Sequence, residues 1–299
     1  MSSEHLASAQ NLLKGNLAGA WDILSGAQGL SGQPDLGIAR RFGGAAAAYS
    51  LRDIGAMGGR VVEVRRSSDN ETEDFSANQV ASGVVESFVG GSNSGFVSKW
   101  YDQSGNGLDM AQTTTADQPR IVNSGTLETI DGKPTIKFLN IGTNLGSTFL
   151  ENSSPVALPT AMTAFFVTSA TIVSGTRMTF SGGVADFAFD EPRLELRRGS
   201  TNLESTLTLS SDTNSLLVYN NNSSFLTRFD INNSSETKSG ITGTDGENSF
   251  QFLGENSSSA SNDTFGLQGT MSEVILYTID LDSEITDVKN EINNFYQTF

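Results

Sequence analysis

The chain has 299 residues, of which 36% are hydrophobic and 17% charged, and its formal net charge is −16. This length is enough for one large all-β core or two small ones, and the acidic surface repels phosphate backbones, which disfavours nucleic-acid binding. The chain has no cysteine and a single histidine, His5, which excludes disulfides, a thiol nucleophile, and a Ser-His-Asp triad or histidine metal site inside the folded domain.

Apolar residues recur at helical spacing from Leu6 to Leu24, which predicts an amphipathic N-terminal helix. Gly15 and Gly19 each weaken such a helix by about 1 kcal/mol relative to alanine, so it needs a surface to lie against. That surface is either its own domain or a neighbouring subunit. Residues 25–37 are rich in glycine and serine and predict a tether. The helix would make its contacts through Leu6, Leu13, Leu17, Trp21 and Leu24.

We expect residues 1–44 to form this helix and tether, and residues 45–299 to form the domain. Short runs of β-forming residues, separated by Gly, Ser, Asn and Asp, recur along the domain and predict two antiparallel sheets packed face to face. Segment 74–88 is ambiguous because its valines also have helical spacing. The candidate strands are 61–66, 96–101, 120–122, 134–139, 162–168, 177–180, 186–189, 194–197, 205–209, 216–219, 225–231, 250–253 and 267–277.

The last 20 residues predict a C-terminal helix. Its acidic residues lie in the first turn, where the helix dipole favours them. One apolar stripe follows the 3.6-residue period and contains Leu281, Ile285, Val288, Ile292 and Phe295. No run in the sequence is apolar enough for a signal sequence or a membrane span.

The strand at 96–101 ends in Asp102-Gln-Ser-Gly-Asn-Gly107, which predicts a tight turn. Gly105 and Gly107 allow the positive φ that such a reversal needs, and the Asp102 carboxylate is expected to accept hydrogen bonds from nearby backbone N–H groups. We predict that Trp100 lies in the core and that Tyr101 and Gln103 face the solvent.

This octet from Trp100 to Gly107 forms a signature with three further segments, Tyr49-Ser-Leu-Arg52, Val62-Glu-Val-Arg-Arg-Ser-Ser-Asp-Asn70 and Gln118-Pro-Arg-Ile-Val122. From about Tyr49 onward the chain resembles the LamG-like, concanavalin A-like sandwich proteins of bacteriophage virions. The same signature occurs in the catalytic domain of B-type α-L-arabinofuranosidases. The resemblance implies an all-β antiparallel jelly-roll sandwich.

The phage resemblance implies a non-enzymatic virion structural protein, a component of a capsid decoration, fibre or tail, assembled in the host cytoplasm. Other virion proteins would bind the N-terminal helix, and a homo-oligomer is expected. Many displayed copies would strengthen weak binding to host-surface glycan through avidity. The basic pairs at 40–41, 65–66 and 197–198 are separated by acidic stretches and are interpreted as structural.

The arabinofuranosidase resemblance implies the alternative, a glycoside hydrolase, which needs two carboxylates. The nucleophile segment expected from the family is missing, because residues 179–187 lack its cysteines and its glutamate. Glu255 occupies the position that the resemblance gives to the general acid. We therefore expect no enzymatic activity, with Glu255 a relic. A free carbohydrate-binding module is a third hypothesis.

The turn at 102–107 also offers candidate binding residues. A sugar-binding site needs an aromatic ring and planar polar side chains, which Tyr101, Gln103 and Asn106 supply. Oxygen atoms of Asp102, Asn106 and Asp109 are candidate calcium ligands, although turn formation alone also explains the first two. No other cofactor is expected.

Overall fold

The computed structural model describes residues 37–56, 58–139, 148–171, 177–182, 185–190, 192–198, 201–239, 249–254 and 267–299. The predicted N-terminal helix, with its contact residues, lies outside these ranges. The compact unit described here begins at Gly37, eight residues earlier than predicted. Ile38 and Ala39 are fully buried in it, so the last part of the predicted tether belongs to the domain.

The expected all-β antiparallel sandwich is confirmed, because every strand pairing recorded among the described residues is antiparallel. The largest sheet contains β1 Ala47–Ser50, β2 Arg60–Arg66, β3 Thr72–Ser76, β4 Gly95–Trp100, β5 Met110–Ala111, β6 Arg120–Asn123, β7 Thr126–Leu127, β10 Ile136–Phe138, β11 Leu150–Ala157, β12 Met162–Ala170, β17 Ser215–Asn221, β18 Leu226–Ile231, β19 Ser234–Ser239, β20 Ser249–Leu253 and β21 Gly269–Tyr277. A small hairpin pairs β8 Thr129–Ile130 with β9 Lys133–Pro134.

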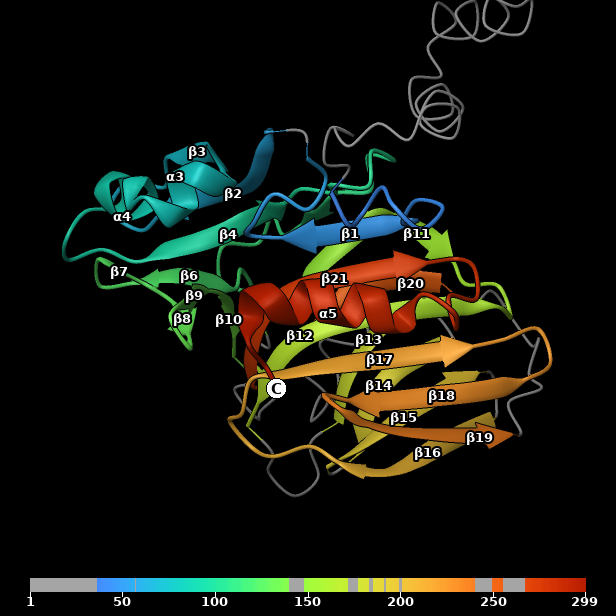
Figure 1. Cartoon of the computed structure of the whole chain (residues 1–299). Coiled ribbons are helices and arrows are strands. Elements are labelled where there is room, and N and C mark those ends of the chain that lie inside the picture. The colour runs from blue at the N-terminus through green and yellow to red at the C-terminus, as the bar shows by residue number, and fades with distance from the viewer. Residues whose placement is uncertain are drawn as a thin grey trace, which may run out of the picture. The chain divides into compact units, whose positions relative to one another are not determined.

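A separate four-stranded sheet closes the sandwich. It consists of β13 Arg177–Gly182, β14 Ala185–Asp190, β15 Arg193–Arg198 and β16 Thr201–Thr208, joined in chain order. The main sheet runs β19-β18-β17-β12-β21-β10-β6-β4-β5-β11-β20. Because β13 lies beside β20 and β16 beside β19, the four strands bridge the two ends of the main sheet. In Figure 1 they lie behind β17 and β18.

The central strands β12, β17 and β21 are buried on both faces. Alternate side chains of a strand point to opposite faces of its sheet. One face, which includes Phe166, Tyr219 and Val274, packs toward Phe187 and Leu196 of the four-stranded sheet. This face forms the larger core.

The opposite face of the same strands forms a second core under the C-terminal helix α5, Ile285–Tyr296. Phe165, Val218 and Tyr277 pack there against Ile285 and Ile292 of the helix. Figure 1 shows α5 lying across β21, β12 and β17. The predicted C-terminal helix is thereby confirmed. In the described ranges, no helix combines the length and the apolar character that a membrane crossing requires.

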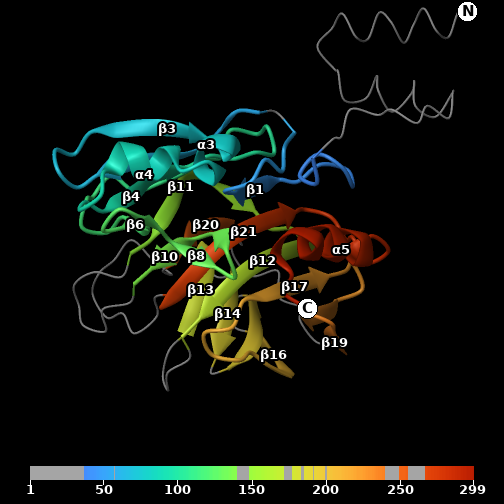
Figure 2. The same cartoon turned by 60° about the vertical axis from the view of Figure 1, so that its left-hand side comes forward.

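The ambiguous segment 74–88 divides between a strand and two short helices, α3 Ala77–Ala81 and α4 Val84–Val89. Ser76 begins α3 with a capping box, since it accepts a hydrogen bond from the Gln79 N–H while the Gln79 side chain accepts one from the Ser76 N–H. Figure 2 shows both helices close to β4 and β6. They cover the sheet at the end away from α5.

A buried ion pair fastens α5 to the second core. Arg52 donates from Nε and NH2 to the two carboxylate oxygens of Glu273, each at 2.8 Å. Glu273 is 1% exposed and also accepts from Ser50 and from the hydroxyl of Tyr296 on the helix. Burial lowers the pKa of Arg52, but the Glu273 carboxylate outweighs this and raises it above its usual value.

Replacing Arg52 with methionine tests this pair. Glu273 would stay buried without its cation, so we expect a loss of about 3–5 kcal/mol in the free energy of unfolding, measured by urea denaturation. Arg60→Met is the control, because Arg60 forms an exposed pair with Asp74 and exposed pairs contribute little. Equal shifts in the two variants would contradict the structural role given to Arg52.

Candidate functional site

The turn after β4 is held together by the Asp102 carboxylate. Its Oδ1 accepts from the backbone N–H groups of Ala48 and Ser104, both at 2.9 Å. Its Oδ2 accepts from the Ser104 hydroxyl at 2.7 Å and the Leu108 N–H at 3.1 Å. Gly105 and Gly107 have φ of +94° and +73°. The predicted turn, and the role of Asp102 in it, are confirmed.

Trp100 is fully buried, as predicted, but the expectation that Tyr101 and Gln103 face the solvent is wrong. Tyr101 donates its hydroxyl to Asp74 at 2.6 Å, and the Arg60 guanidinium lies 4.3 Å from its ring centre. Burial and the Asp74 carboxylate raise the pKa of Tyr101 above its usual value. Because a cation already covers the ring, the ring is not an open platform for a sugar.

Gln103 is buried and ties the turn to the segment before β2. Its Oε1 accepts from the Ile54 N–H at 2.9 Å, and its Nε2 donates to the carbonyls of Ser50 and Arg52. Asn106 donates from Nδ2 to the carbonyls of Ala45 and Ala46. These bonds give both amides a structural task. Ligand binding by Tyr101, Gln103 and Asn106 stays a prediction.

The candidate calcium ligands are also engaged within the protein. A carboxylate has about four lone-pair sites, and the four bonds to Asp102 use them. Asp109 Oδ1 accepts from the Asp102 N–H at 2.9 Å. Within the described ranges, no three acidic or histidine side chains are grouped as a metal site. Turn formation therefore explains these residues without a cation.

The carboxylate expected from the resemblance, Glu255, lies outside the described residues. Three acidic side chains are buried in the part of the chain that is described. Two of them, Asp230 and Glu273, are ion-paired: Asp230 accepts from Lys289 at 2.6 Å and from Arg228 at 2.8 Å, and Glu273 from Arg52. Both bind basic groups under or beside α5 and have structural roles.

The third buried carboxylate, Glu195, lies in β15, where it is 2% exposed. Its neighbours Leu194 and Leu196 belong to the larger core, so alternation places Glu195 on the opposite face of the four-stranded sheet. Directly opposite it, in β16, is Glu204. Residues directly opposite in an antiparallel pair share a face, and their Cβ atoms are about 4.5–5.5 Å apart.

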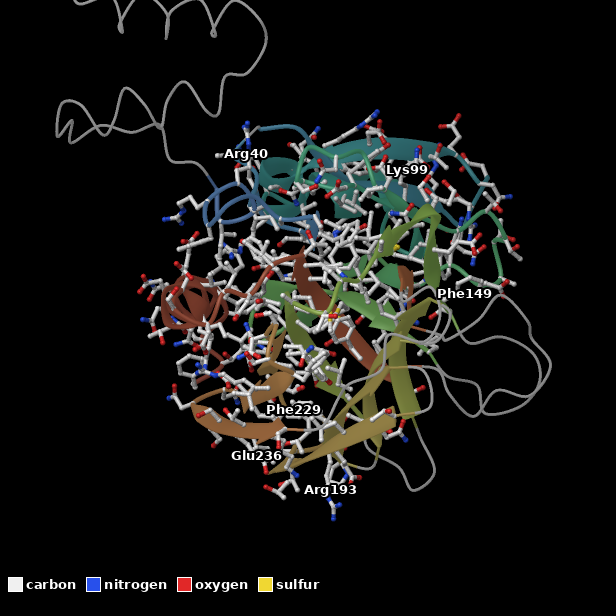
Figure 3. All side chains as sticks on the ribbon, turned by 90° about the vertical axis from the view of Figure 1, so that its right-hand side faces the viewer. Arg40, Lys99, Phe149, Arg193, Phe229 and Glu236 are labelled. Carbon is white, nitrogen blue, oxygen red and sulfur yellow. The ribbon has the colours of Figure 1, made fainter. Side chains whose placement is uncertain are left out.

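These two carboxylates have unlike surroundings. The Glu204 side chain is 43% exposed, and its Oε2 accepts from Arg193 NH1 at 2.9 Å. Figure 3 shows Arg193 projecting outward from the body, near Glu236, whereas Phe229 lies among the strands. Burial raises the pKa of Tyr219 in the larger core, and the Glu195 carboxylate raises it further.

This pair of carboxylates was not predicted from the sequence. An acidic residue between two leucines in a predicted strand, at 194–197, was the available signal for Glu195. The signal for Glu204 was weaker, because β16 is polar apart from Leu203 and Leu207, so an acidic residue does not stand out in it. Their opposition depends on the register between the two strands, which the sequence does not supply.

Neither a protein-family model nor a curated protein sequence matches this chain. Solved structures do. A GH54 α-L-arabinofuranosidase soaked with a cyclic sulfate inhibitor is 16% identical, with a TM-score of 0.58 over 83% of this chain. An arabinofuranosidase complexed with arabinofuranosyl-α-1,2-xylobiose is also 16% identical, with a TM-score of 0.57 over 83%. The chain spans 62% of the length of each protein. At this identity the likeness shows the fold.

These similarities correct two expectations. A non-enzymatic virion protein was expected, but the two solved structures named above, whose fold the chain shares, are glycoside hydrolases. The expectation that the chain is not an enzyme is contradicted by the same finding. The relation to the arabinofuranosidase catalytic domain is supported, whereas the similarities reported above do not show a bacteriophage protein or a LamG-like domain.

Replacing Asp102 with asparagine tests the turn. The new Nδ2 would face N–H donors where a carboxylate oxygen accepted two hydrogen bonds, so we expect a loss of about 2–3 kcal/mol in the free energy of unfolding. The loss should be the same with calcium and with a chelator. Asp131→Asn is the control, at an exposed position with φ of +50° that asparagine tolerates. A loss that appears only when calcium is present would contradict the turn-only role.

Proposed function

We propose that this protein hydrolyses glycosidic bonds of α-L-arabinofuranosides, with Glu195 and Glu204 as its two catalytic carboxylates. The observation that carries the proposal is their direct opposition across β15 and β16. Glycoside hydrolysis requires two carboxyl groups close to one scissile bond, and the register brings a buried and an exposed one together on one face.

The spacing of the pair suits one of the two hydrolytic mechanisms. Retaining glycosidases hold their carboxyl groups about 5–5.5 Å apart, and inverting ones about 6.5–9.5 Å apart. Side chains that leave one sheet face from directly opposite positions start about 4.5–5.5 Å apart. From these starting positions the two glutamate side chains can bring their carboxyl groups to the separation of a retaining pair, so we propose hydrolysis with retention.

The unlike surroundings of the pair support a division of roles. Burial of a carboxyl group disfavours its ionised form, which suits Glu195 as the proton donor. Glu204 is exposed and hydrogen-bonded to Arg193, so it is accessible to a substrate and suits the role of nucleophile. Glu204 would attack the anomeric carbon while Glu195 protonates the departing oxygen. Water activated by Glu195 would then cleave the ester at Glu204, and the proton returns to Glu195.

The choice of sugar is supported by the fold. The arabinofuranosidases share it over 83% of this chain, and one of them holds arabinofuranosyl-α-1,2-xylobiose. We therefore propose that this protein, like that one, binds an arabinofuranosyl group. The same comparison supports a broader description of this protein as a carbohydrate-binding β-sandwich.

Loss of either carboxylate should abolish hydrolysis. Glu195→Gln and Glu204→Gln should each lower kcat for 4-nitrophenyl α-L-arabinofuranoside by at least about 10²–10⁴-fold, because each removes one chemical role without changing side-chain shape. Glu71→Gln is the control, an exposed carboxylate beside Arg66 in another part of the sandwich. Circular dichroism confirms that each variant is folded. Full activity in either site variant would exclude the pair.

Retention should be visible directly in the product. Proton NMR recorded during the first turnovers of a methyl α-L-arabinofuranoside should show the α-anomer of arabinose before mutarotation. Azide added to Glu204→Ala should restore turnover and yield the β-arabinofuranosyl azide, because the anion replaces the missing nucleophile. The β-anomer as first product would contradict a retaining pair.

A further inference from the structure

A cavity of about 470 Å³ lies at the end of β16. Its walls come from β16, the loop between β16 and β17, the turn between β18 and β19, and Phe299. Ligand pockets in proteins commonly measure about 300–1,000 Å³, so the cavity is large enough for a small ligand. We call it the Phe299 cavity.

The lining of the Phe299 cavity is polar but uncharged. Five exposed polar residues line it: Thr206, Thr208, Thr213, Asn233 and Ser234. The lining residues, which all lie in the described ranges, include no charged side chain. An ionic ligand would find no counter-charge there, whereas a neutral polyhydroxylated ligand would find donors and acceptors.

The polar wall is held in place by hydrogen bonds to two residues that do not line the cavity, Leu216 and Glu236. Asn232 has φ of +54°, and its side-chain Oδ1 accepts from the Leu216 N–H at 2.8 Å while its own N–H donates to the Leu216 carbonyl at 2.8 Å. This fixes the turn that carries Asn233. On the other side, Glu236 accepts from the Thr206 N–H and hydroxyl, at 2.6 and 3.0 Å.

The apolar part of the wall is held equally firmly. Gln297 has φ of +56° and ends α5, after which the chain turns back. The Asn293 side chain then accepts from the Phe299 N–H at 3.0 Å and donates to its carbonyl at 2.9 Å. Lys289 Nζ lies 5.9 Å from the centre of the Phe299 ring, farther than Arg60 lies from the Tyr101 ring, and Phe299 is 38% exposed whereas Tyr101 is buried. A fixed aromatic ring beside hydroxyl and amide groups offers both an apolar surface for a sugar ring and partners for its hydroxyls.

We propose that the Phe299 cavity binds a neutral oligosaccharide, at a site that does not require Glu195 or Glu204. Phe299 packs against one sugar ring, and Thr208 and Asn233 bind its hydroxyl groups. Such a site would hold a polysaccharide chain on the protein whether or not that chain is being cleaved. The inference concerns binding and stands apart from the proposed hydrolysis.

The test uses the full 299-residue chain carrying Glu195→Gln and Glu204→Gln, so that no probe is cleaved. Three neutral probes, α-1,5-arabinotriose, xylotriose and maltotriose, are titrated by calorimetry, with trigalacturonate as the charged comparison. We expect at least one neutral probe to bind, and trigalacturonate to bind at least about tenfold more weakly. Adding Phe299→Ala should weaken the neutral probe about tenfold, which is about 1.4 kcal/mol.

Thr208→Val is a second variant, because it removes a hydroxyl without changing the shape of the side chain, and it should also weaken the probe. Ile279→Ala is the matched control, since Ile279 is 44% exposed and does not line the cavity. The inference is overturned if no neutral probe binds, or if Phe299→Ala and Thr208→Val both leave affinity unchanged. Binding that persists while the unmodified chain hydrolyses nothing would remove only the proposed activity.

Discussion

The structure depends on three strands that are buried on both faces. In β12, β17 and β21 consecutive residues serve different cores, so that Phe165 packs under α5 and Phe166 toward the four-stranded sheet. A shift of one residue in register would exchange the two sets. With both faces apolar, neither can be left to the solvent. This requirement explains why the chain needs a helix on one side and a second sheet on the other.

The two candidate sites, the carboxylate pair and the Phe299 cavity, involve positions that are not fixed by burial on both faces. The four-stranded sheet contributes only one face to the larger core, through residues such as Leu194 and Leu196. Its other face carries Glu195 and Glu204, which are directly opposite each other across β15 and β16. The Phe299 cavity lies at the ends of β16, β17 and β18 and at the loops that join them, where most of the lining residues are polar. Rigid strands thus position side chains that packing does not specify.

Sequence reasoning succeeded where burial dominates the pattern. The strands β12, β17 and β21 were predicted because their apolar runs are continuous, and α5 because its stripe follows the helical period. The strands β11 and β19 were missed, since one contains a proline and the other, Ser234–Ser239, is a polar strand at the sheet end with no apolar alternation. The carboxylate pair was missed for another reason. Register between strands depends on tertiary pairing, which local pattern does not determine.

The account is tested most directly by finding which residue becomes covalently attached to sugar. A cyclic sulfate analogue of α-L-arabinofuranose reacts with the nucleophile of a retaining enzyme, and the modified peptide is located by mass spectrometry. We expect a single sugar on the peptide that contains β16, attached at Glu204 and absent in Glu204→Gln. A sugar attached to any other residue, at the same stoichiometry in both proteins, would contradict the assignment of Glu204.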